Sequence, residues 1–258
     1  IGVADVISVS TSCFHRLNRD LRLSPDYRHI VKLASILSGL AFVAHMIGNV
    51  IITINRYSTL CLLQKYDKYW KRRNVWILIA IQYTIASVSF LQTFGAKLVY
   101  DQYADGTFFY VGLEKGFNLA NRSIYVAVCM IYAIVSINLN VRLLLEWHRL
   151  SQAGNLSRHS RQEKGLVLYA MSVFLFSALM CAQQLTKGFA VFTDNKSLNM
   201  WATLHFYWIN DAMVIIPPLS LLLLSSELRR EIINFCKCTR RKAGNIALHS
   251  TISSESVN

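Results

Sequence analysis

Charge is scarce in this sequence, and so are proline and glycine. Of the 258 residues, 53% are apolar and 16% charged, with 3 prolines and 11 glycines. Acidic and basic side chains are missing from residues 33–55, 74–96, 123–141 and 165–186, and residues 197–226 contain a single acid. An α-helix needs about 20 residues to cross the hydrocarbon core of a bilayer. These uncharged runs exclude a soluble globular domain and predict an all-α membrane protein.

Six helices are expected, at about residues 1–17, 30–54, 75–98, 122–146, 165–187 and 200–224. They would form one transmembrane helical bundle over residues 1–235, followed by a disordered cytoplasmic tail at residues 236–258. The first helix is too short to cross a bilayer alone. We therefore expect the chain to begin inside a helix, with at least one earlier helix absent. A buried or interfacial N-terminal segment is the alternative.

Lysine and arginine are unevenly divided between the two sets of connecting segments. Residues 55–74, 142–164 and 225–258 hold 17 of them, against 10 in residues 15–32, 97–122 and 187–199. Basic residues are in excess on the cytoplasmic side of membrane proteins, so the first set and the C-terminus should be cytoplasmic. The net charge of +13 then fits contact with anionic lipid headgroups, and no nucleic-acid partner is expected.

Cysteine is absent from the outer segments 97–122 and 187–199, so no extracellular disulfide is expected. Asn-X-Ser sequons at Asn121 and Asn195 would face outwards and are expected to be glycosylated, whereas the sequon at Asn155 would face the cytosol. Cys236 and Cys238 follow the last crossing closely and are candidates for palmitoylation. Two ordinary free thiols are the alternative.

Sequence patterns of intramembrane enzymes are also missing. The seven histidines are scattered, without an HxxxH or HxxHH set, and no Gly-X-Ser-X-Gly motif occurs. Intramembrane proteases and desaturases need paired acids, Ser/His pairs or histidine clusters at helical spacing. We therefore expect no enzyme, no metal site and no cofactor.

A polar stripe runs along the second expected helix. At 100° per residue, Phe42, His45, Asn49 and Arg56 all lie within 40° of Ser38. Because an unpartnered polar group that faces lipid costs free energy, the stripe should face the interior of the bundle. The alternative for Arg56 is that its side chain reaches the lipid headgroups, as basic residues at helix ends often do.

The last expected helix carries one acid, Asp211, within the membrane. A charged side chain at mid-depth costs about 2.5–3.5 kcal/mol on insertion scales, so it should point inwards. We expect an interior polar network of Asp5, His45, Asn49 and Asp211, without a specific partner for Asp211; Asn49 and Asp5 are its candidates. A separate, satisfied interior acid is the alternative for Asp211.

The triplet Asn55-Arg56-Tyr57 ends the polar stripe and resembles the Asp-Arg-Tyr element of seven-helix G-protein-coupled receptors. In that family an interior Asp lies about fifty residues earlier, and here Asp5 precedes Arg56 by 51 residues. Trp76 fits the tryptophan that is characteristic of the fourth helix. On this resemblance the six helices correspond to helices two to seven.

A closer resemblance is to the nematode serpentine chemoreceptors of class gamma (Srg) and relatives such as class V. It rests on an ordered set of segments: "NRYSTL", "KYDKYW", "NLNVRLLLEWHRLS" running into "RQEKGLVLYAMSVFLF", and "PPLSLLLLSSELRR". The chain departs from most rhodopsin-like receptors in having Asn55 in place of an acid. It also lacks the Asn-Pro-X-X-Tyr element, although Pro217 and Pro218 would kink the last helix.

The resemblance implies a chemosensory receptor that binds a small extracellular ligand and activates a heterotrimeric G protein. It implies a multi-pass protein of the plasma membrane in sensory neurons. Asn55, Arg56 and Tyr57 would contact the G protein. The ligand pocket would draw on Lys32, Ser35, Phe42, Phe108, Phe109 and His205. The alternative is a membrane transporter whose path is formed by Asp5, His45, Asn49 and Asp211.

Overall fold

The computed structural model describes residues 2–22, 24–61, 66–102, 106, 108–152, 159–224, 229–230 and 234. The long helices of this part of the chain are α1 (Gly2–Leu21), α2 (Arg28–Cys61), α4 (Arg72–Phe90), α5 (Lys115–Gln152), α6 (His159–Phe192) and α7 (Lys196–Leu224). The shorter elements are η1 (Pro25–Tyr27), α3 (Tyr66–Tyr69), η3 (Leu91–Gly95), β1 (Leu98–Gln102) and β2 (Phe108–Leu113). The expected all-α membrane fold is confirmed, with a small β-hairpin added to it.

Five of the described helices, α2 and α4 to α7, are long and apolar enough to cross a membrane. Helix α1 is shorter, and four of its residues are acids or arginines. These helices can lie in lipid for two reasons: their side chains carry few charges, and a helix satisfies its own backbone hydrogen bonds there. Several of the long helices extend beyond the uncharged windows, since a helix does not have to end where the hydrocarbon ends.

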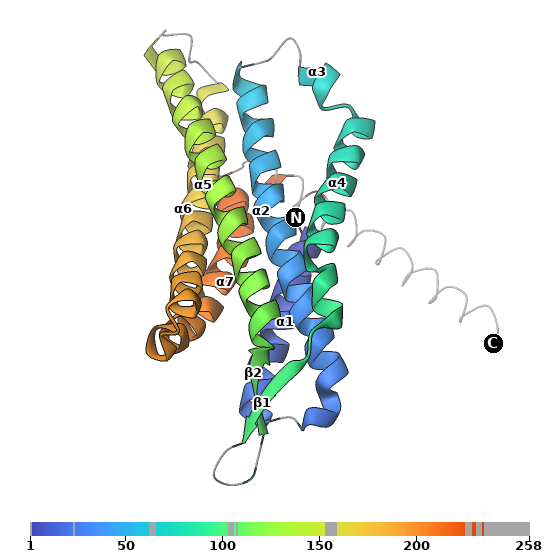
Figure 1. The fold of residues 1–258 in the computed structure, drawn as a ribbon. Coiled ribbons are helices and arrows are strands. Elements are labelled where there is room, and N and C mark those ends of the chain that lie inside the picture. Colours follow the sequence, from blue (N-terminus) through green and yellow to red (C-terminus); the bar gives the residue numbers. More distant parts are fainter. Residues whose placement is uncertain are drawn as a thin grey trace, which may run out of the picture.

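Helix α2 lies at the centre of the bundle (Figure 1) and contacts α1, α4, α5 and α6. Helices α5, α6 and α7 pack in sequence order, and α1 contacts α7 and so joins the two ends of the row. The hairpin β1–β2, the end of α1 and the start of α2 lie at one end of the bundle, which we call the hairpin end. Residues 55–57 and α3 lie at the opposite end, called here the triplet end.

The hairpin is an antiparallel pair in which Leu98 lies opposite Leu113 and Gln102 opposite Phe108. An irregularity in the pairing falls between Val99 and Tyr100, and such bulges bend a strand and increase its twist. Strand β2 contacts α1 and α5. The hairpin therefore covers the helix ends at this side of the bundle.

The bundle core is apolar and tightly packed around α2. Phe42, Met46, Phe90 and Met180 are each at most 5% exposed. Gly39 of α2 is needed here, because a Cβ at this position would overlap the ring of Phe90 on α4. A glycine that permits so close an approach of two helices is typical of membrane bundles.

The outward faces of the helices are also apolar. On α4 alone, Trp76, Ile77, Ile81, Ile85 and Val88 are each at least 46% exposed. Soluble monomers rarely expose contiguous apolar surface of this kind. The exposed side chains therefore form a lipid-facing surface around the bundle.

Candidate functional site

Asp5 and His45 form the central polar contact of the bundle. The Oδ1 atom of Asp5 on α1 lies 2.7 Å from Nδ1 of His45 on α2. The His45 side chain is only 3% exposed, and its Nε2 has no hydrogen-bond partner among the described residues. His45 therefore depends on Asp5 for its one polar contact in this part of the chain.

Asn49 lies one turn further along α2 and contacts a different helix. Its Nδ2 donates to Oγ of Ser177 on α6 at 2.8 Å, and both residues are buried. An interior polar group needs a partner because its desolvation is otherwise uncompensated. The stripe along α2 thus connects first to α1 and then to α6.

Asp211 has another partner than the sequence suggested. Its Oδ2 lies 2.6 Å from Nη2 of Arg16 on α1, and the Arg16 guanidinium lies over the ring of Tyr207 at 4.9 Å. Among the described residues the ion-pair partner of Asp211 is thus Arg16, and not Asn49 or Asp5, the two candidates that the sequence offered. Arg16 is closer because α1 packs against α7, whereas α2 contacts α7 weakly at most.

Asn210, the neighbour of Asp211, is a buried residue that the sequence reading missed. Its Oδ1 accepts from Ser8 at 3.0 Å and its Nδ2 donates to Ser12 at 3.1 Å. Ser8 and Ser12 are four residues apart and share one face of α1. This spacing was the available signal for a polar α1–α7 interface.

The residues expected in the ligand pocket are dispersed. Lys32 Nζ donates to the carbonyl oxygen of Phe94 at 3.0 Å, and Phe42 packs edge-on against Tyr125 in the core. Phe108 is 41% exposed on the hairpin, and His205 is exposed and stacks on Trp201 of its own helix. Phe109 lies on β2, but its side chain is outside the described part. The role of this set in ligand binding stays a prediction.

Ser35 is the member of that set that faces the interior at the hairpin end. Its Oγ lies 3.4 Å from the Tyr110 hydroxyl, and the Tyr110 ring stacks on His15 with centroids 6.5 Å apart. Burial raises the pKa of the Tyr110 phenol above its ordinary value, so the side chain is neutral. Arg122 and Lys187 lie in the same region and were also missed.

The triplet residues lie at the opposite end of α2. The Arg56 guanidinium is 5.9 Å from the ring centroid of Tyr169 on α6, and Arg56 Nε is buried without a hydrogen-bond partner among the described residues. Asn55 Oδ1 accepts from the Tyr66 hydroxyl at 3.1 Å. Tyr57 is half-buried. Arg56 is therefore directed towards α6 and not into lipid.

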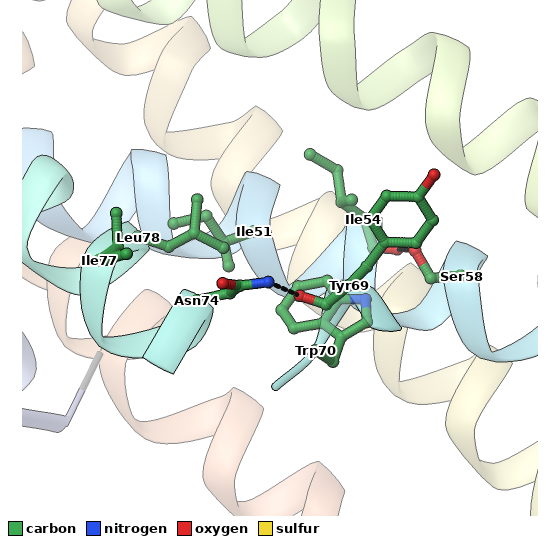
Figure 2. A pocket seen from close by; sticks show the side chains of 8 residues that line it. All are labelled: Ile51, Ile54, Ser58, Tyr69, Trp70, Asn74, Ile77 and Leu78. Atoms are coloured by element: carbon green, nitrogen blue, oxygen red, sulfur yellow. Dashed lines mark hydrogen bonds between the residues drawn. The ribbon is translucent and has the colours of Figure 1, made fainter. Parts of the chain in front are cut away.

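A pocket of about 480 Å³ lies beside the triplet between α2 and α4 (Figure 2). None of the described residues that line it is charged, and Asn74 Nδ2 donates to the carbonyl oxygen of Tyr69 at its edge. Its lining is Ile51, Ile54, Ser58, Tyr69, Trp70, Asn74, Ile77 and Leu78. This composition suits an apolar group and does not suit a charged ligand.

The expected modification sites differ in their accessibility. Asn121 is 7% exposed, and its Nδ2 donates to Oγ1 of Thr93, so its burial argues against a glycan at this sequon. Asn195 is exposed before α7, and its Oδ1 accepts from the backbone N–H of Leu198. Cys236 and Cys238 lie outside the described residues.

The segments NRYSTL, KYDKYW, NLNVRLLLEWHRLS and PPLSLLLLSSELRR occur in this order in a bundle of membrane-spanning helices. Together these features are those of a serpentine receptor. The sequence profile of the Srg family chemoreceptors matches residues 21–232, and the chain belongs to this family. No curated protein matches the chain. The Srg family is a seven-transmembrane family of receptors and not of enzymes, so the expectations of a chemoreceptor and of no enzymatic activity are confirmed. The chain is thus a multi-pass membrane protein.

Proposed function

We propose that this chemoreceptor binds a small molecule among the helices at the hairpin end and activates a heterotrimeric G protein at the triplet end. The hairpin end would then face outwards, with the C-terminus in the cytosol. The receptor would act in the plasma membrane of sensory neurons. Asn55, Arg56 and Tyr57 would lie at the contact with the G protein.

The observation that supports the proposal most directly is the series of polar contacts along α2. His45 contacts α1, Asn49 contacts α6, and Arg56 contacts α6 again at the triplet end. Because α2 spans the bundle with a rise of about 1.5 Å per residue, one rigid helix joins both ends. A shift of α1 or α6 relative to α2 would alter these contacts together.

A ligand can favour one arrangement of the helices only by its differential affinity for the two states. Binding at the hairpin end would displace α6 or α1 relative to α2. Arg56 would then exchange its contact with the Tyr169 ring for an acceptor on the G protein. Arg56 Nε has no acceptor among the described residues, which supports such an exchange, since a buried donor without an acceptor is costly.

A transporter finds less support in the same contacts. Asp211 is neutralised by Arg16, Asp5 contacts His45, and Asn49 contacts Ser177. These are three separate pairings and not one continuous path for a substrate or proton. Concentrative, proton-linked uptake into vesicles that contain the protein would nevertheless favour a transporter over the receptor.

The proposed function is tested by expressing the chain with a promiscuous Gα subunit and screening small volatile and water-soluble molecules. We expect an active compound to stimulate nucleotide exchange, and Arg56→Ala to reduce that stimulation at least about tenfold while surface expression survives, because a hydrogen bond from a charged donor is lost. Arg142→Ala is the matched control, because Arg142 is exposed on α5. Full signalling by the Arg56→Ala receptor would exclude the assigned role.

A further inference from the structure

Arg122 on α5 and Lys187 on α6 place two cations in the interior at the hairpin end. Arg122 Nη1 donates to Oε1 of Gln184 at 3.2 Å, and Gln184 lies one turn before Lys187 on α6. The two cations are close enough for their charges to repel each other. Both positions fall inside helices, and neither is fully exposed.

Neither cation is neutralised by a carboxylate from the described residues. Among the described residues, the ion pairs of the interior are Arg16 with Asp211 and His45 with Asp5, and no acid lies within 4.0 Å of Arg122 or Lys187. The Tyr110 phenol, which also faces Arg122, is held neutral because burial raises its pKa. A buried charge without a counter-ion is strongly unfavourable, so these two side chains lack, within the described part of the chain, the compensation that an anion would give them.

Aromatic rings surround these charges. The Arg122 guanidinium lies 5.0 Å from the ring centroid of Tyr125, and Lys187 Nζ lies 5.9 Å from that of Phe206. Cation–π contacts of this kind contribute about 0.5–2 kcal/mol, less than a buried charge costs. Arg122 Nε is buried and has no acceptor in the described part of the chain.

Arg122 Nε–H, which has no acceptor among the described residues, and the nearby Lys187 ammonium indicate the chemistry of a group that would bind here, an anion. A guanidinium presents Nε–H and Nη–H donors in a plane that matches the two oxygens of a carboxylate, whereas an ammonium acts as a point charge. The rings of Tyr125, Phe206 and His15 would contact the apolar or aromatic remainder of such a molecule. His15 and Tyr110 stack beside the cations, and Ser35 closes the group at α2.

We propose that Arg122 and Lys187 form the anion subsite of the ligand pocket, and that the ligand is a small organic acid with an apolar body. This rests on the proposed receptor function. The carboxylate accepts from Arg122 Nε and lies between Arg122 and Lys187, and the remainder of the molecule packs on the aromatic rings. A carboxylate that contacts both cations binds more tightly when α5 and α6 lie close together. This difference in affinity favours that arrangement of the two helices.

The test uses the complete chain in lipid nanodiscs, without a G protein. Short-chain, medium-chain and aromatic carboxylic acids are each compared with the primary amide of the same skeleton, and ligand binding is measured by thermal stabilisation. We expect acids but not amides to stabilise the receptor. Arg122→Gln and Lys187→Gln should each weaken acid binding about ten- to hundredfold, and Arg122→Lys should retain part of it.

Lys115→Gln and Lys196→Gln are the matched controls, because both lysines are exposed at the hairpin end on the same helices or next to them. They should leave acid binding unchanged. Equal binding of acids and amides, a panel in which no acid stabilises the receptor, or acid binding that survives both Arg122→Gln and Lys187→Gln would each overturn the proposal.

A second measurement needs no ligand. Lys187→Met removes an uncompensated charge and retains an unbranched chain of similar length, so the ligand-free receptor should melt at a higher temperature. A lower melting temperature would show that Lys187 already has its stabilising partner, and the anion subsite would be wrong. Acid binding without nucleotide exchange would contradict the proposed function and leave the subsite intact.

Discussion

Arg16 on α1 and Asp211 on α7 form a 2.6 Å ion pair between helices at opposite ends of the chain. Their side chains are 32% and 30% exposed, and the Arg16 guanidinium also lies over the Tyr207 ring. Together with the bonds of Asn210 to Ser8 and Ser12, this pair fixes α1 against α7. The polar α1–α7 interface is thus separate from the polar contacts of α2.

The Arg16–Asp211 pair can be tested by a double-mutant cycle. Arg16→Gln and Asp211→Asn should each lower the free energy of unfolding by about 1–3 kcal/mol, because each leaves the other charge partly buried and unpaired. The exchange Arg16→Asp with Asp211→Arg should recover part of that loss. Thermal unfolding of the purified protein measures all the variants. Strictly additive effects of the two single substitutions would show that the residues do not interact.

His45 supports a second prediction, because Asp5 is its hydrogen-bond partner in the described part of the chain. Asp5→Ala should destabilise the protein by about 1–3 kcal/mol, since both ring nitrogens of His45 would then be buried without a partner. Asp5→Asn should cost less, because an amide still hydrogen-bonds the imidazole. Asp20→Ala is the control: its carboxylate is 65% exposed on the same helix, and its loss should change the melting temperature little.

The positions of His45 and Asn49 on α2 could be predicted because a long helix keeps a constant angle between residues. Their partners could not. Asp5, Ser177 and Arg16 come from other helices, and the order in which helices pack around α2 is not encoded in the periodicity of any one of them. For this reason the sequence left the partner of Asp211 open, and the structure pairs it with Arg16.

Arg122 and Lys187 were missed for a different reason. The uncharged windows end near both residues, so they were counted among the charges of the outer segments. The structure continues α5 back to Lys115 and α6 on to Phe192. Arg122 and Lys187, which mark the edges of two hydrophobic windows in the sequence, therefore lie inside helices, where their side chains contact neighbouring helices. A rule based on hydropathy cannot separate a cation in a loop from a cation near the end of a helix that contacts neighbouring helices.

Gly39 permits a third prediction about the approach of α2 to α4. Gly39→Ala should destabilise the bundle by about 1–3 kcal/mol, because the added Cβ overlaps the buried Phe90 ring and over-packs the core. Gly116→Ala is the matched control, since nothing lies within 4 Å of a Cβ at that position in the first turn of α5. There alanine should be neutral or stabilising, because it favours the helix more than glycine does.

The Gly39 pair is measured by thermal unfolding in detergent and by yield at the cell surface. A double variant, Gly39→Ala with Phe90→Leu, should recover part of the loss, because the smaller side chain gives way to the new methyl group. If Gly39→Ala behaved like Gly116→Ala, the close packing of α2 on α4 would be wrong.

Asn195 and Asn121 test the orientation of the bundle. Both carry sequons at the hairpin end, but Asn195 is exposed before α7 while Asn121 is buried and bonded to Thr93. If the hairpin end faces outwards, Asn195→Gln should abolish an endoglycosidase-sensitive shift in gel mobility, and Asn121→Gln should leave that shift unchanged. A shift that persists in Asn195→Gln and disappears in Asn121→Gln would place the sugar on the buried residue and contradict the packing of α5 against η3. A chain with no sensitive shift at all would contradict the expected glycan at Asn195.

The inner and outer faces can also be assigned by labelling single cysteines introduced at Lys196 and Arg142. If the hairpin end faces outwards, Lys196→Cys should react with a membrane-impermeant reagent on intact cells, and Arg142→Cys should be protected from it.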